Sequence, residues 1–208
     1  MRVLLFSLIF MTGFTIQSFS QYKGGIEIGG NIMGASEFIV SGDNLETKSS
    51  WGIRLGYVAA YELTESFFLK GAILINQRGF NYSDERWGLN AVDLPLNLGF
   101  SAPIGEKGMK WFLDAGINIE YNFRAFTKVN DELVTLSIGN ETGDIKPFSF
   151  GVNGGTGIQF TERMQLRFSY YYGLTNLLQT SEDSWKNFVI GTALIFHFQK
   201  NQASPIVY

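Results

Sequence analysis

Apolar and polar side chains alternate along eight stretches of this chain. In the clearest of them, residues 111–124, the odd positions read Trp, Leu, Ala, Ile, Ile, Tyr and Phe, and the even positions from 114 on read Asp, Gly, Asn, Glu, Asn and Arg. Successive side chains of a β-strand point to opposite faces, so the pattern predicts strands with one apolar and one polar face. The predicted strands cover about residues 22–33, 49–62, 65–79, 87–101, 109–125, 146–160, 163–174 and 185–198.

The predicted connections alternate in length along the chain. The long ones are residues 34–48, 80–86, 126–145 and 175–184, and the short ones are 63–64, 102–108 and 161–162. Long loops at one end and short turns at the other are typical of outer-membrane barrels, whose short turns are periplasmic. An even number of strands then predicts that both ends of the mature chain are periplasmic.

The apolar faces of the predicted strands carry no charge. A Lys or Arg that faced lipid at the midplane would cost about 2–4 kcal/mol, so this absence is expected of a lipid-exposed surface. Aromatic residues also gather near both ends of the strands, as they do at membrane–water interfaces. One belt is Tyr61, Phe67, Phe100, Trp111, Phe160 and Phe198, and the other is Trp51, Trp87, Phe123, Phe148, Tyr172 and Phe188.

These observations predict an all-β fold, an eight-stranded antiparallel up-and-down transmembrane β-barrel with a filled polar interior. The alternative is a soluble, lipocalin-like barrel whose apolar face points inward. The alternation of apolar and polar side chains alone does not say which face is outside. The two aromatic belts and the alternating loop lengths favour the membrane.

The opposite, polar face collects twelve titratable residues. An eight-stranded barrel is just wide enough for side chains to fill it, so we expect these charges to pair across a plugged interior. Glycines on the same face would leave room for arginines and for Tyr171; they are Gly25, Gly29, Gly52, Gly56, Gly116, Gly151, Gly155, Gly157 and Gly191. The titratable set is Lys23, Glu27, Arg54, Glu62, Lys70, Arg78, Asp93, Asp114, Glu120, Arg124, Arg167 and His197.

No catalytic, cofactor-binding or metal-binding residues are predicted. His197 is the only histidine, and the chain contains no cysteine, which excludes disulfides, thiolate metal sites and a lipoprotein anchor. The enzymatic alternative is that Asp93, Asp114 and Glu120 act in acid–base catalysis. The nearly equal numbers of acids and bases on the polar face favour a structural ion network instead.

The first 20 residues resemble a secretory signal peptide. Arg2 is followed by an apolar stretch that is too short to span a bilayer, and Ser18 and Ser20 provide the small residues of a cleavage site. We therefore expect a signal peptide over residues 1–20 and one barrel domain over 21–208. Removing Arg2 changes the net charge from −3 to −4. Such a mildly acidic domain lacks the excess of positive charge that is expected of a nucleic-acid-binding protein.

Four stretches resemble the PorT-like outer-membrane β-barrel proteins of Bacteroidetes-type bacteria. Residues 91–99 are similar to the family's acid-x-Pro-Leu strand, and residues 67–79 to a strand followed by an exposed glycine turn. Residues 167–176 fit its Tyr-x-x-Gly-Leu-x-Asn ending, and residues 187–198 its closing strand. The likeness covers nearly the whole mature chain and implies an outer-membrane barrel. The founding member is implicated in protein secretion across the outer membrane, and the tail 199–208 departs from the family pattern.

We therefore expect a non-enzymatic outer-membrane barrel with a structural or protein-interaction role that is linked to secretion or surface assembly. Its partners would be the lipid bilayer and proteins that contact loops 34–48 and 126–145. Within the second loop, the short β-like run 133–138 suggests an extra hairpin. The alternatives are an enzyme that acts on lipid or peptide at the barrel rim and a narrow solute channel.

Overall fold

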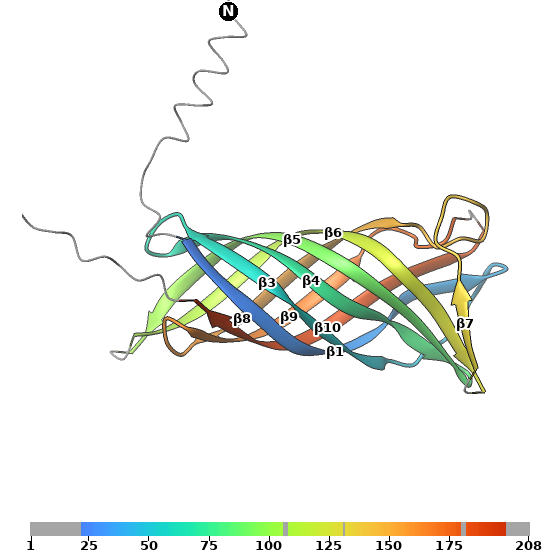
Figure 1. Ribbon diagram of the computed structural model, residues 1–208, viewed down its shortest axis with the longest axis horizontal. Coiled ribbons are helices and arrows are strands. Elements are labelled where there is room, and N and C mark those ends of the chain that lie inside the picture. Colours follow the sequence, from blue (N-terminus) through green and yellow to red (C-terminus); the bar gives the residue numbers. More distant parts are fainter. Residues whose placement is uncertain (1–21, 106–107, 131, 180–181, 199–208) are drawn as a thin grey trace, which may run out of the picture.

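The computed structural model describes residues 22–105, 108–130, 132–179 and 182–198, which form one antiparallel sheet rolled into a barrel (Figure 1). Eight long strands pair in the order β10-β9-β8-β6-β5-β4-β3-β1, and pairing of β1 with β10 completes the ring. The eight-stranded antiparallel prediction is confirmed. The strands are β1 (Tyr22–Val40), β2 (Asp43–Asn44), β3 (Ser50–Glu62), β4 (Phe67–Tyr82), β5 (Glu85–Ile104), β6 (Met109–Val129), β7 (Glu132–Leu136), β8 (Phe148–Gln159), β9 (Met164–Gly173) and β10 (Ser184–His197).

The strand registers define how steeply the strands wind around the barrel. When each residue is followed to its paired residue on the next strand, the path that starts at Trp51 on β3 returns to β3 at Tyr61. The closed ring therefore has a stagger of ten residues. With strands about 4.8 Å apart and a rise of about 3.3 Å per residue, this stagger gives a strand tilt of about 40°. The ten residues from Trp51 to Tyr61 then rise about 25 Å, which is the height of the apolar band of an outer-membrane barrel.

The outer face of this region is apolar, as predicted. Trp51, Ile73 and Leu98 expose 69%, 58% and 56% of their surface, whereas the side chains that alternate with them point into the barrel. We call this part of the barrel the trunk. Large apolar or aromatic side chains exposed on it include Ile28, Ile53, Leu55, Tyr57, Leu69, Ile75, Leu94, Leu96, Leu113, Ile117, Phe150, Phe168, Tyr170, Ile190, Leu194 and Phe196.

At one end the strands continue beyond the apolar band. We call this extension the crown and define it as residues 34–49, 79–90, 123–130, 132–147, 174–179 and 182–187. Figure 1 shows it at the end opposite the start of β1 and the end of β10, with β7 at its edge.

Three of the predicted loops are therefore partly strand. β1 runs on to Val40, and only Ser83 and Asp84 separate β4 from β5. In the predicted loop 126–145, β6 continues to Val129 and returns as β7, so the extra hairpin is confirmed. The prediction ended these strands too early because it followed the lipid-facing alternation, which stops where the crown begins.

Two side chains lie on the other face from the one predicted. The pairing of β5 with β6 shifts at Asn90/Ala91, where β6 carries one extra residue opposite β5. Beyond this bulge the parity of β6 is reversed, so Ala125 is buried and Arg124, predicted inside, is exposed. Trp87, predicted in the lipid-facing belt, points inward and packs against Phe80.

The predicted signal peptide, residues 1–20, and the tail, residues 199–208, lie outside the described residues. Within the part of the chain that the structure describes, no helix is long and apolar enough to cross a membrane.

Candidate functional site

Arg78 is the centre of the first ion cluster inside the trunk. Its Nη2 lies 2.7 Å from Oδ2 of Asp93 and its Nη1 lies 2.6 Å from Oε1 of Glu120. These two carboxylates are direct cross-strand partners on β5 and β6, and without the guanidinium between them they would repel each other. The ring of Tyr171 lies on the same guanidinium, with its centroid 4.0 Å from Cζ.

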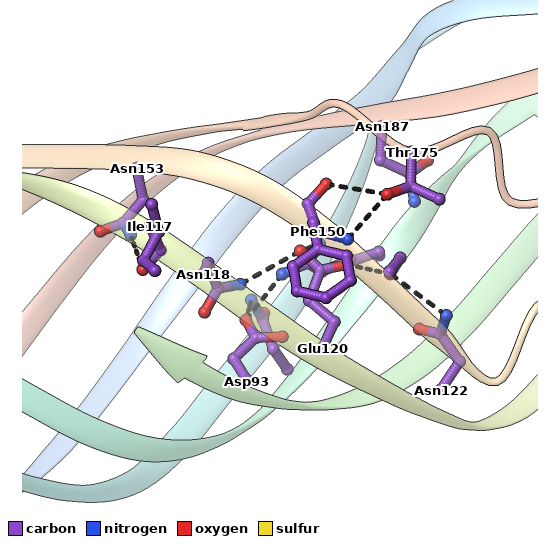
Figure 2. Close-up of polar contacts among 12 residues, drawn as sticks. Asp93, Ile117, Asn118, Glu120, Asn122, Phe150, Asn153, Thr175 and Asn187 are labelled. Carbon is purple, nitrogen blue, oxygen red and sulfur yellow. Dashed lines mark hydrogen bonds and ion pairs between the residues drawn. The ribbon is translucent and has the colours of Figure 1, made fainter. Parts of the chain in front are cut away.

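Amides and a hydroxyl donate further hydrogen bonds to these carboxylates. Asn76 donates to Asp93 over 2.7 Å, and Asn118 donates to Glu120 over 3.1 Å. The hydroxyl of Ser149 donates to the second oxygen of Glu120 over 2.6 Å. Figure 2 shows Asp93, Asn118, Glu120 and Asn122 grouped on the inner side of adjacent strands.

A second and a third cluster follow toward the other end of the trunk. Arg167 holds Asp114 through two parallel hydrogen bonds of 2.5 and 2.8 Å, a bidentate arrangement that only a guanidinium provides. Arg54 lies 2.7 Å from Glu27, and Lys70 lies 3.9 Å from the other oxygen of Glu27.

The buried charges of the described interior balance. Four acids (Glu27, Asp93, Asp114, Glu120) and four bases (Arg54, Lys70, Arg78, Arg167) are each at most 8% exposed. Because an unpaired buried charge is strongly unfavourable, this balance and the short contacts indicate a structural plug. It accounts for Asp93, Asp114 and Glu120, the carboxylates of the enzymatic alternative, as members of ion pairs.

The remaining predicted interior residues lie at the end of the trunk opposite the crown. Lys23 and Glu62 form a half-buried ion pair of 2.6 Å there, and His197 is buried beside Gly25 of β1. Among the described residues, no group of three or more His, Asp or Glu side chains is placed to hold a metal ion.

The interior glycines do make room for large polar side chains, as predicted. A Cβ on Gly151 would lie 2.3 Å from the ring of Tyr171, and a Cβ on Gly155 would lie 2.5 Å from Cζ of Arg167. Any larger residue at either position would displace a member of the ion clusters.

The interior of the crown has the opposite character, because it is filled by apolar side chains. Phe80 packs against Phe38, Trp87 and Trp185, with ring centroids 4.6, 6.0 and 5.3 Å away. The indole N–H groups of Trp87 and Trp185 donate to Glu85 and Asn187 over 3.0 and 2.6 Å. The buried members of this cluster are Phe38, Phe80, Leu89, Ala125, Ile145, Leu177 and Trp185.

Two connections lie across this cluster and close the mouth of the barrel. Ile145 and Leu177 are 1% and 2% exposed, and the segments that carry them are joined by backbone hydrogen bonds from Lys146 to Leu177 and from Gln179 to Asp144. The crown is therefore a small packed core, built like the interior of a soluble domain.

An ion pair spans the seam between β1 and β10 in the crown. The pairing shifts between Ala35 and Glu37, and just beyond this shift the carboxylate of Glu37 accepts hydrogen bonds from Ser184 and, over 3.1 Å, from Lys186. The hydrogen bond from Ser184, followed by that from Lys186, lowers the pKa of Glu37 below its ordinary value. This contact holds the extended part of β1 against β10 above the shift.

The β6–β7 hairpin is a largely exposed element of the crown. Among the described strands, β7 pairs only with β6, from Val129↔Glu132 to Ala125↔Leu136. Leu136 packs on the apolar cluster, whereas Leu133 and Val134 are each 49% exposed. This hairpin lies in the loop 126–145 that the sequence indicated as a contact site. The apolar crown core was not predicted, although its aromatic residues stand out in the sequence.

A closed eight-stranded antiparallel barrel with an apolar band about 25 Å high and an ion-paired interior defines the class of small outer-membrane β-barrels. The chain matches the family described as Outer membrane protein beta-barrel domain over residues 9–179, and it belongs to that family. The protein is therefore an outer-membrane protein, as predicted. None of the curated proteins matches the chain.

Solved structures of other proteins are similar to this chain at low sequence identity. Neisserial surface protein A is 14% identical with a TM-score of 0.51, and the match covers 88% of this chain and 100% of that one. Ail of Yersinia pestis, in complex with the heparin analogue sucrose octasulfate, is 15% identical with a TM-score of 0.45 and coverages of 86% and 99%. The N-terminal barrel domain of Pseudomonas aeruginosa OprF is 13% identical with a TM-score of 0.40 and coverages of 86% and 100%.

Proposed function

We propose that the protein is a non-enzymatic barrel that presents its crown at the cell surface as a docking site for another protein. The observation that carries the proposal is the exposed β7 strand, held by a packed apolar core above the membrane-spanning trunk. In this orientation the short turns and both ends of the mature chain are periplasmic, after cleavage of a signal peptide over residues 1–20.

The outer edge of β7 is suited to pairing with another strand. Val129 and Glu132 are the end pair of this hairpin, and when that pair is hydrogen-bonded, hydrogen-bonded and non-hydrogen-bonded pairs alternate from it onward. The N–H and C=O groups of Leu133 and Thr135 then point away from β6. β7 carries no proline, lysine or bulge of the kind that protects exposed strand edges.

The occupant that fits this edge is an extended segment of a different protein, added as a further strand. Two copies of β7 would pair antiparallel about an axis perpendicular to their sheet. Since β7 continues the barrel wall, that axis would lie in the membrane plane and would invert one of the two barrels. A second copy in the same membrane is therefore the poorer partner.

Proline at position 135 tests the edge directly. Thr135→Pro removes the outward N–H but leaves the neighbouring pairs with β6, and Thr135→Val keeps the N–H as the matched control. In cross-linked outer membranes, we expect proline to reduce the protein recovered with the barrel about tenfold and valine to leave it unchanged. Equal recovery with all three proteins would overturn the docking role of β7.

The orientation has its own test, which the absence of cysteine makes clean. A single cysteine at Glu132 should react with a membrane-impermeant maleimide on intact cells, and a cysteine at Glu65, in the turn between β3 and β4, should not. The reverse result would contradict a surface-exposed crown.

The resemblance to PorT-like proteins supports a link of this docking role to secretion or surface assembly. A stable complex with secretion components in the same cross-linking experiment would support that link. The enzymatic alternative would gain from an activity that is lost in Asp93→Asn with the barrel intact, and the channel alternative from steady single-channel currents through a planar bilayer.

A further inference from the structure

The outer face of β4, β5 and β6 changes character abruptly at the crown end of the apolar band. The last apolar row across these strands is Ile75, Val92 and Tyr121. Above it follow three more rows in register: Gln77, Asn90 and Arg124; then Gly79, Gly88 and Phe126; then Asn81, Arg86 and Lys128. These nine positions contain three bases and no acid.

Two of the bases lie at the edge of the band, Arg86 through contacts with Trp51 and Arg124 through its position in the register. The guanidinium of Arg86 donates to the carbonyl oxygen of Trp51 over 2.9 Å and lies 5.8 Å from the centroid of the Trp51 ring. Trp51 is the crown-side end of the lipid-facing row of β3, so the charge of Arg86 is brought down toward the lipid. Arg124 follows Tyr121, in the first row above the band.

An aromatic platform lies between these bases. The ring of Phe126 packs closely against Gly88 of β5, since a Cβ on Gly88 would lie 2.3 Å from it. Cζ of Arg124 is 5.5 Å from the centroid of the same ring. The bulge in β6 is what turns Arg124 and Phe126 outward together, so the patch depends on a feature of the folded sheet.

We propose that Arg86, Arg124, Phe126 and Lys128 bind the phosphorylated sugar headgroup of a glycolipid in the outer leaflet. Guanidinium groups match phosphate oxygens in pairs, and an aromatic ring offers an apolar surface for the sugar. The patch begins one row above side chains that face acyl chains, where a lipid headgroup must lie. The assignment of this patch to the outer leaflet rests on the proposed orientation of the crown. The match between its side chains and a phosphorylated sugar does not depend on that orientation.

Neutralising the patch should weaken binding strongly. Each base near a membrane surface contributes roughly fivefold to the affinity for an anionic headgroup, so the triple variant R86Q/R124Q/K128Q should bind about 100-fold more weakly. The matched control is K23Q/K110Q/R163Q, which removes the same charge at the other end of the barrel. The probe is diphosphoryl lipid A, and native mass spectrometry of the folded full-length barrel in a zwitterionic detergent measures the lipid bound.

The experiment separates a headgroup site from general charge attraction. We expect the patch variant alone to lose binding, and lipid A without phosphates to bind the wild type and both variants equally weakly. Equal loss in the two triple variants would overturn the proposal. Equally tight binding of a soluble phosphorylated disaccharide would overturn the assignment to a lipid and favour a soluble polyanion instead. Neither readout uses β7, so a failed docking test leaves this one intact.

Discussion

The trunk and the crown are built from the same strands but are packed in opposite ways. In the trunk, the inward side chains include Arg78, Glu120 and Asp114, and the outward ones include Ile73 and Leu98. In the crown, Phe80 and Trp185 point inward, whereas Arg124 and Lys128 point outward. The surrounding solvent explains the reversal, because lipid selects an apolar exterior and water allows an apolar interior.

This difference assigns different tasks to the two regions. An ion-paired trunk fills the lumen and keeps its charges away from lipid, at the cost of burying four acids and four bases. A hydrophobic core stabilises the crown. The fold of the crown therefore does not depend on its outer side chains, which can vary with the partner that they bind. The functional proposals accordingly concern the surface of the crown and its border with the trunk.

Removing the centre of the trunk network should have the largest effect. Arg78→Met leaves Asp93 and Glu120 buried side by side without a counterion, so we expect a loss of about 4 kcal/mol in the free energy of unfolding. Guanidinium unfolding of the barrel in lipid vesicles measures it. The triple variant R78M/D93N/E120Q removes all three charges and should recover much of the loss. If it is no more stable than Arg78→Met, the network is not held by charge pairing.

The next largest effect is expected from a lysine on the outer face, which should destabilise the protein more in the trunk than in the crown. Ile73 lies near the middle of the apolar band, because its partner Tyr57 is about halfway between Trp51 and Tyr61. Ile73→Lys should cost about 3 kcal/mol, whereas Asn90→Lys, in the first polar row, should cost less than about 1 kcal/mol. The same unfolding assay compares them, and equal costs would contradict the boundary between trunk and crown.

A cavity in the crown core should have a smaller and more local effect. Leu177→Ala removes a buried side chain from a connection that can partly collapse, so we expect a local loss of about 2–3 kcal/mol. Hydrogen exchange should then quicken in residues 137–147 and 174–179 but not in β3 or β4. Faster exchange throughout the trunk would show that the two regions unfold as one.

Much of the trunk was predictable because a lipid-facing strand repeats every two residues. The two faces and eleven of the twelve titratable interior residues follow from that period alone, whereas Trp87 of the predicted aromatic belts points inward. Arg124 does not, because one extra residue in β6 at the Asn90/Ala91 shift reverses the parity beyond it. A bulge leaves no periodic signal in a stretch this short, and the basic patch that depends on it was therefore invisible in the sequence.

Most of the crown was predicted as loops, with one short β-like run. Trp185 lies far along the chain from Phe80 and Trp87, and nothing in the sequence spacing says that it packs against them across the barrel mouth. Loop 126–145 was singled out in the sequence as an exposed contact site, and it contains the largely exposed strand β7. That β7 has an open edge depends on the absence of a second partner strand, which is a property of the folded sheet.

By itself, the sequence determined the class of protein, the membrane it occupies and the face on which most side chains lie, because alternation along a strand is a local property of the backbone. The tertiary structure alone decided which charges pair, where the polar interior gives way to an aromatic core, and which bases reach the edge of the lipid. Those outcomes depend on strand register and closure, which bring together residues that no local pattern connects.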